Sequence, residues 1–327
     1  MKYLYIMLLT CGLYARPSHH LPPHTDEPIN ELSKFSPWYT GTLLATSGYN
    51  EPPGEVDIQG YLFFSDTYGK YDSNESFGAS EIEFKPVFFF ETGITSFCDL
   101  NIVIQSPYTK KGSQKAFGYG DTSIALGWQV AKENPHSAKP AVRILTGELF
   151  PTGKYRNLDE QKKGIDATGA GSFQTTMLIS ITKILYWFYN HPLQYRFNFA
   201  YVIPANVHVT NFNAYGGGFN TDGTVKPGQS LLAIFAVEYS LNQNWVLATD
   251  ISYTYTFKTT FSGIAGTTVT GAQASVNAPA SQSLILTPTI EYNFSLNLGA
   301  LLSSWFTVWG KHTDKFGGAA FSVTYVF

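Results

Sequence analysis

The sequence has few charges, little cysteine and no long apolar run. Only 14% of its 327 residues are charged, against about 25% in an ordinary soluble domain. Lys and Arg total 21 and Asp and Glu total 24, for a formal net charge of −3. This balance lacks the basic footprint of a nucleic-acid binder, so no nucleic-acid partner is expected. No stretch reaches the ~18 consecutive apolar residues that indicate a membrane-spanning helix.

Cysteine occurs only twice, at Cys11 and Cys98. Cys11 falls in a predicted signal peptide, which leaves Cys98 alone in the mature chain. This excludes an internal disulfide and a multi-cysteine metal site. We interpret Cys98 as a small apolar residue rather than a nucleophile.

Aromatic residues, by contrast, are abundant. They make up 16% of the chain, with 25 Phe and 21 Tyr, while the mean hydropathy is only −0.07. Many aromatics without an apolar block indicate that apolar and polar residues alternate, as they do in membrane-spanning β-strands.

The N-terminus is typical of an exported protein. Residues 1–15 form a predicted signal peptide, with Lys2 as its positive region and residues 3–13 as its apolar region. Residues 17–37 are rich in proline and predict a flexible tail. Three histidines in this tail, beside two acidic residues, could capture a metal, but their spacing fixes no geometry and a solvated tail is the preferred interpretation. We therefore predict no metal site and no cofactor.

From residue 55 onward the sequence has a strand-like period of two rather than a helical one. Most predicted strands have ten to thirteen residues, close to the ~9–11 of a tilted membrane strand. The predicted strands are 55–66, 80–92, 96–107, 119–132, 140–150, 173–189, 193–204, 230–241, 245–257, 282–294, 298–310 and 317–327.

The connections between these strands alternate between short and long, except that the last one, 311–316, is brief where a long one is due. Bacterial outer-membrane barrels have an even strand number, short periplasmic turns and long external loops. We therefore predict an all-β protein, in which residues 55–327 form a transmembrane antiparallel up-and-down β-barrel of twelve strands. Both termini lie in the periplasm of this bacterial outer-membrane protein.

The parity of the side chains supports this barrel. In residues 193–201, Leu and aromatic residues on one face alternate with mainly polar residues on the other, as expected between lipid and a wet lumen. The chain ends in an alternating strand with an aromatic last residue, Phe327. Such an end resembles the strand by which the outer-membrane assembly machinery recognises its clients. Outer-membrane lipid and this machinery are thus expected partners.

Two residues depart from the parity. Lys183 lies on the predicted lipid face, where a charge at the midplane would cost ~2–4 kcal/mol. We expect a bulge that redirects it, or a strand longer than the membrane. Glu148 has the same parity but lies near the external rim, where the cost is smaller.

Residues 16–54 precede the barrel as a periplasmic or plug-like segment. Residues 38–54 are too apolar for a plain linker. They could enter the lumen as a plug, lie under the barrel, or form a thirteenth strand. The even-number rule favours the plug.

By parity, ten charged side chains face the lumen, seven acidic and three basic. A mixed ring of charge can select ions or orient a polar solute, but the same charges could instead pair across the lumen and stiffen the barrel. The predicted lumen-lining residues are Glu83, Lys85, Glu91, Asp99, Asp121, Arg143, Arg196, Glu238, Asp250 and Glu291.

Three short motifs carry a family resemblance: Gly-Tyr-Gly-Asp-Thr at 118–122, Phe-Pro-Thr-Gly at 150–153 and a Gly-rich stretch at 164–171. With these motifs the chain resembles the outer-membrane "putative MetA-pathway of phenol degradation" proteins, which are transporter-like barrels. The resemblance covers about residues 55–327. It implies a link to aromatic catabolism and uptake of hydrophobic solutes, and it brings no catalytic residues. Asp121 is then a carboxylate at the channel mouth, or an Asp that fixes a turn.

The sequence therefore predicts a channel or transporter for small solutes, including hydrophobic or aromatic ones. The alternative is a surface-exposed binding or structural barrel that acts through its long loops, 205–229 and 258–281. An enzyme is not expected, because His136, His191, His208 and His312 all lie in or beside connections, with no serine partner in evident register.

Overall fold

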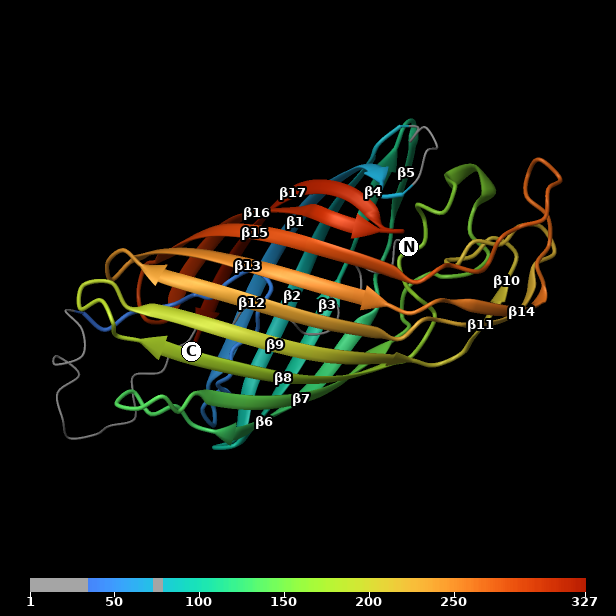
Figure 1. Ribbon diagram of the computed structural model, residues 1–327. Coiled ribbons are helices and arrows are strands. Elements are labelled where there is room, and N and C mark those ends of the chain that lie inside the picture. The colour runs from blue at the N-terminus through green and yellow to red at the C-terminus, as the bar shows by residue number, and fades with distance from the viewer. Residues whose placement is uncertain (1–34, 73–78) are drawn as a thin grey trace.

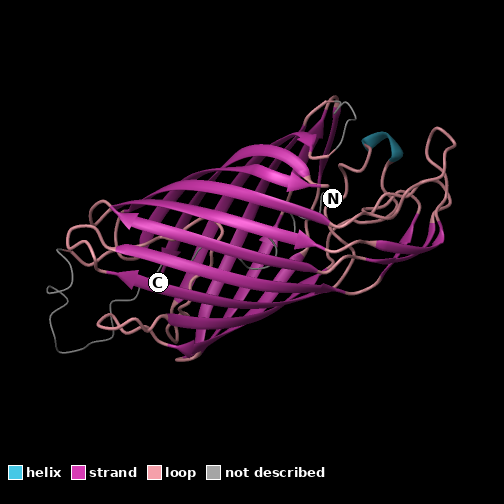
Figure 2. Ribbon diagram, in the orientation of Figure 1, coloured by secondary structure: helices cyan, strands magenta, loops and turns pink. Residues whose placement is uncertain are grey.

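The computed structural model describes residues 35–72 and 79–327. Its main body is a closed antiparallel β-barrel of twelve strands (Figures 1 and 2). The barrel strands are β1 (Val56–Lys70), β2 (Glu81–Thr95), β3 (Cys98–Gln105), β6 (Thr122–Ala131), β7 (Ala141–Phe150), β8 (Gln174–Leu185), β9 (Leu193–Pro204), β12 (Ser230–Ser240), β13 (Trp245–Thr256), β15 (Ser281–Asn293), β16 (Leu298–Lys311) and β17 (Asp314–Val326).

Consecutive barrel strands pair with one another, and β1 closes the barrel by pairing with both β2 and β17. Closure leaves no free sheet edge, which is what a strand protein needs in hydrocarbon. All twelve predicted strands are present, and the predicted fold is confirmed. Within the described ranges, no helix is long and apolar enough to cross a membrane.

Some predicted boundaries were wrong. The strand predicted over 173–189 ends at Leu185, and its last residues turn away instead. The last link, between β16 and β17, spans only residues 312 and 313. This external connection is therefore a tight turn, and it is the exception to the alternation of short and long connections.

The external connections carry structure that the sequence patterns did not predict. β4 (Tyr108–Lys111) and β5 (Gln114–Phe117) form a hairpin that extends the sheet beyond β3, where a loop was expected. β10 (Val207–Thr210), β11 (Asp222–Lys226) and β14 (Thr260–Ile264) form a separate three-stranded sheet within the two long loops. Figure 1 shows this sheet beyond one end of the barrel. A short 3-10 helix, η2 (Glu160–Lys162), lies in another external loop.

The barrel wall is apolar outside and mixed inside. Along β9 the buried and exposed positions alternate, with Phe197 and Phe199 outward and Arg196 and Asn198 inward. The same period of two runs through β12, β13 and β15. Outward aromatic and aliphatic side chains on a closed barrel place the protein in the bacterial outer membrane.

Lys183 corrects one prediction. No bulge redirects it, because the pairing of β8 with β9 is regular from Gln174 to Leu185. Instead, the connection between β6 and β7 covers it at the inner end of the strand. Its Nζ donates to Glu133 Oε1 at 2.8 Å and to the Asn134 carbonyl at 2.9 Å. A paired and buried ammonium avoids the cost of facing lipid alone.

Candidate functional site: a segment inside the lumen

Residues 39–51 run through the inside of the barrel, and every one of them is buried. They form no strand and are held largely by side chains of the wall. At the inner end, Tyr39 Oη donates to the Pro192 carbonyl, in the turn between β8 and β9, at 3.2 Å. We call residues 39–51 the lumen segment.

Asp250 on β13 is the main anchor of this segment. Its carboxylate accepts the backbone N–H groups of Leu43 at 3.1 Å, Leu44 at 3.4 Å and Ala45 at 3.0 Å. Asp250 itself is fully buried. The carboxylate thus satisfies three donors that have no ladder partner, and hydrogen bonds to a charged acceptor are among the strongest in proteins.

Other polar side chains of the wall bind the segment on either side of this anchor. Glu291 accepts from Gly41 N at 3.2 Å, Asn198 from Thr46 N at 2.8 Å and Thr182 from Gly48 N at 2.7 Å. These acceptors come from β15, β9 and β8. The segment therefore spans the lumen across several strands instead of extending the sheet.

Two carbonyl groups in the middle of the segment also accept hydrogen bonds from the wall. Arg196 Nη1 donates to the Ala45 carbonyl at 3.1 Å. Asn198 Nδ2 and Ser180 Oγ both donate to the Thr46 carbonyl, at 3.0 and 2.8 Å. Buried backbone groups need such partners, so the wall and the segment are complementary in hydrogen bonding.

The wall is also shaped for the segment. A Cβ at Gly299 on β16 would lie 1.8 Å from Thr40 Oγ1, so only glycine fits there. Thr40 Oγ1 in turn donates to Asn293 Oδ1 at 2.7 Å. Glycine in a strand often marks such a close approach.

The predicted lumen residues form two charged clusters. In the first, Arg196 donates to Glu238 through Nε at 2.8 Å and Nη2 at 3.0 Å, a two-pronged pair with no exposed surface. In the second, Arg143 Nη2 pairs with Glu91 at 2.6 Å and also with Asp99. Arg196 and Glu238 thus pair between the neighbouring strands β9 and β12, whereas Arg143 reaches from β7 to residues of β2 and β3.

The remaining predicted residues lie at different depths. Glu291 and Asp250 touch the lumen segment directly, as above. Lys85 is buried, and its Nζ lies 3.2 Å from Oε1 of Glu83. Glu83 is only partly buried and lies toward the outer end of β2. Asp121 lies just before β6, at the external rim, and not among the other charges.

Asp121 connects the external loops to the rim. Its carboxylate accepts Gly153 N at 2.9 Å and Ala170 N at 2.7 Å. Burial raises its pKa to about 6, although the two backbone hydrogen bonds act in the opposite direction. A Cβ at Gly169 would lie 2.2 Å from this carboxylate. The Gly-rich and Pro-Thr-Gly motifs of the sequence thus meet at Asp121, in the turn-fixing role that was one of its two interpretations.

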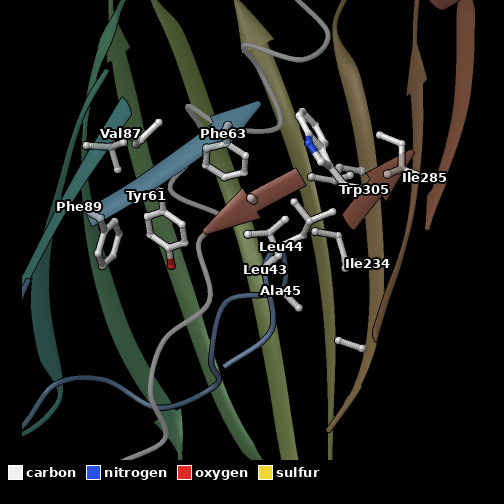
Figure 3. Close-up of a cluster of buried hydrophobic side chains, with 14 of the residues drawn as sticks. Leu43, Leu44, Ala45, Tyr61, Phe63, Val87, Phe89, Ile234, Ile285 and Trp305 are labelled. Atoms are coloured by element: carbon white, nitrogen blue, oxygen red, sulfur yellow. The ribbon is translucent and has the colours of Figure 1, made fainter. Parts of the chain in front are cut away.

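Part of the barrel interior is apolar. Around Leu43 and Leu44, a buried cluster brings in Tyr61, Phe63 and Trp305 from β1 and β16 (Figure 3). Phe63 and Trp305 meet edge to face, with 5.6 Å between ring centroids. The lumen thus has a polar side around Asp250 and Arg196 and an aromatic side around Trp305.

One group of carboxylates has the spacing of metal ligands. Oxygens of Glu51, Asp57 and Glu91 lie within 4.8 Å of one another, all buried. Oxygen ligands of this kind suit Ca²⁺ or Mg²⁺. Arg143 supplies a positive charge at Glu91. The three tail histidines considered above lie outside the described residues.

The predicted lumen-lining residues are all charged, but neutral side chains of the wall bind the lumen segment as well. Thr182, Asn198 and Asn293 bind the lumen segment, and Gln129 Oε1 accepts Asn50 N at 2.9 Å. The signal available was inward parity, which these residues share with the charged ones. Parity places these side chains at the lumen but does not indicate which of them bind backbone groups of the segment.

Comparison with known proteins gives the fold a context. No family model and no curated protein matches the chain. Among solved structures, an outer-membrane channel of Pseudomonas putida F1 is similar, with a TM-score of 0.66 and 11% identity over 85% of this chain and 97% of that one. The likeness is one of fold.

Two further solved structures are similar only at lower TM-scores. The β domain of the Bordetella autotransporter BrkA has a TM-score of 0.45, with 7% identity over 84% of this chain and 100% of that one. A mutant of the monoaromatic hydrocarbon channel TodX has a TM-score of 0.41, with 12% identity over 84% of this chain and 90% of that one.

Proposed function

We propose that the protein is an outer-membrane channel for small apolar or aromatic solutes, that it is not an enzyme, and that the lumen segment keeps it closed. The observation that carries this proposal is the anchoring of Leu43, Leu44 and Ala45 to Asp250. A filled structural barrel needs only side chains in its interior. A separate stretch of backbone that is held mainly by side chains can leave the lumen without breaking the barrel, so it can act as a plug.

The energetics favour a segment that can leave. Its N–H groups bind carboxylates, amides and hydroxyls of the wall, and water can replace each of these partners. A typical exchange of one such bond for water costs only about 0.5–1.5 kcal/mol. A closure built from several such bonds is stable, yet it opens without disturbing the barrel ladder.

The solute class follows from the aromatic side of the lumen. Tyr61, Phe63 and Trp305 face inward from β1 and β16 and are buried there. Aromatic side chains offer large apolar contact areas to rings and short hydrocarbons. The resemblance of residues 118–122 and 150–153 to the phenol-degradation barrels supports the same class.

A reversible lock tests this proposal. Thr40 and Asn293 lie side chain to side chain, so a Thr40→Cys/Asn293→Cys variant, made with Cys98→Ala, should form a disulfide that fastens the segment to β15. Uptake of small aromatic solutes into proteoliposomes is then measured before and after reduction. We expect no uptake in the oxidised protein and wild-type uptake after reduction.

The control is Thr40→Cys alone in the same Cys98→Ala background, which cannot form the lock. Equal uptake in the locked and reduced proteins would place the segment outside the solute path. A complete lack of uptake in wild type and in every variant, with the barrel folded, would favour the second candidate function.

That second candidate is a surface-exposed binding or structural barrel. The external sheet of β10, β11 and β14 favours it, because the sheet has its own small core of Val207, Val209, Val225 and Val276. Loops that fold into a packed unit can present a stable binding surface. Removing this unit would abolish such binding but would leave solute uptake intact.

A further inference from the structure

A cavity lies at the external rim, away from the lumen segment. It has a volume of about 90 Å³ and is partly open. The outer ends of β8, β9, β13 and β15 line it from below, through Gln174, Pro204, Thr256 and Ser281. Residues of the long external loops line the rest of it, and Figure 1 shows these loops beyond this end of the barrel.

The lining of this cavity is mainly apolar and carries no charge among its described residues. Proline, alanine and valine side chains contribute, together with Tyr215 and Phe257. Charged or strongly hydrated molecules would lose their water here without gaining a partner. The cavity therefore suits a neutral and largely apolar molecule.

Most polar groups around the cavity are already bonded. Tyr215 Oη donates to the Ala170 carbonyl at 2.8 Å. Thr259 Oγ1 accepts from Gly228 N at 3.1 Å, and Thr256 shares a hydrogen bond with Ser230 at 2.9 Å. These groups hold the loops to the rim, and among the described lining residues one other side chain has a buried acceptor without a partner.

That side chain is Gln174, the first residue of β8. It is only 5% exposed, and its Oε1 has no hydrogen-bond partner among the described residues. Its cross-strand neighbours are Leu149 and Pro204, neither of which has a polar side chain that could donate to it. A buried acceptor without a donor is destabilising and calls for a partner.

We infer that this cavity binds a small, neutral, mostly apolar molecule with one hydroxyl group, which donates its hydrogen bond to Gln174 Oε1. The volume is smaller than the roughly 150 Å³ of an apolar cavity that takes benzene, so a single ring would place its hydroxyl end inside and its other end in the open mouth of the cavity. In the proposed channel, this site would hold a solute at the external rim before the lumen opens. This role in transport rests on the proposed function. Binding itself does not require transport.

The experiment compares two molecules of nearly equal size. 4-Fluorophenol carries the hydroxyl, and 4-fluorotoluene carries a methyl group in its place. Binding of each to the full chain in nanodiscs is measured by fluorine NMR line broadening. We expect the wild type to prefer 4-fluorophenol by about tenfold, the value of one net hydrogen bond of about 1.4 kcal/mol.

Two variants assign the binding to this cavity. Gln174→Leu should bind both compounds equally, because it keeps the apolar volume and removes the acceptor. Ala278→Leu, which fills the cavity while leaving the backbone bonds of Ala278 to Thr259 intact, should bind neither compound there. The shift in gel mobility between unboiled and boiled samples confirms that each variant is folded.

The inference is overturned if wild type binds both compounds equally, or if Gln174→Leu keeps the preference for the phenol. Binding that survives Ala278→Leu would place the site elsewhere. A normal hydroxyl preference in a protein that passes no solute would refute the channel and leave the binding site standing. Solute uptake by a protein without this hydroxyl preference would refute the binding site and leave the channel standing.

Discussion

Asp250→Ala should release the lumen segment. The substitution removes the acceptor of three backbone N–H groups, those of Leu43, Leu44 and Ala45. At about 1 kcal/mol for each bond exchanged with water, the closed state loses about 3 kcal/mol. Since 1.36 kcal/mol corresponds to a factor of ten, the open population should rise about a hundredfold. Asp250→Asn keeps one acceptor oxygen and should have a smaller effect.

The open population can be measured by thiol labelling. A Thr46→Cys variant in the Cys98→Ala background places a reporter on the lumen segment, where Thr46 is only 1% exposed. A hydrophilic maleimide should label it about a hundredfold faster when Asp250 is also replaced by Ala. Ser137→Cys, in an exposed inner turn, should label at one rate in both backgrounds. An unchanged rate at position 46, in a folded barrel, would refute the anchoring role of Asp250.

Three further predictions follow from other contacts. Gly299→Val should displace the segment through its clash with Thr40 and raise conductance, and Thr40→Gly in the same chain should restore closure. Glu238→Ala should lower the free energy of unfolding by about 3–5 kcal/mol, because it strands the buried Arg196, whereas Arg196→Met/Glu238→Leu should cost much less; urea unfolding in detergent compares them. Asp121, with a pKa raised to about 6, binds its proton more tightly in the native state than in the unfolded chain. The Asp121 contribution to the stability of the loop of residues 151–173 is thus greatest below about pH 4. It is lost as the pH rises through about 6, by at most about 3 kcal/mol. Hydrogen exchange of this loop should speed up over the same pH range in wild type but not in Asp121→Asn.

The barrel could be predicted from the sequence because its two signals are local and periodic. A lipid face imposes alternation on each strand, and the two sides of the membrane impose different connection lengths. Strand limits such as 193–204 follow from this alternation alone. The external sheet of β10, β11 and β14 could not be predicted from the sequence, because its three short strands come from two loops and pair only in the folded protein.

The site was only partly predictable for a related reason. Parity assigns Asp250 and Arg196 to the interior, but it cannot say which charges meet. The path of residues 39–51 depends on acceptors from many strands, and no local pattern records such contacts. Lys183 is the clearest example, because its partner Glu133 lies fifty residues away.

The central claim is that the lumen segment closes a channel. Single-channel conductance in a planar bilayer tests it most directly, by comparing the full chain with a variant that lacks residues 35–50. The account predicts brief, rare openings in the full chain and a stable, larger conductance in the shortened protein. If both proteins fold and conduct equally, or if neither conducts, the claim is contradicted.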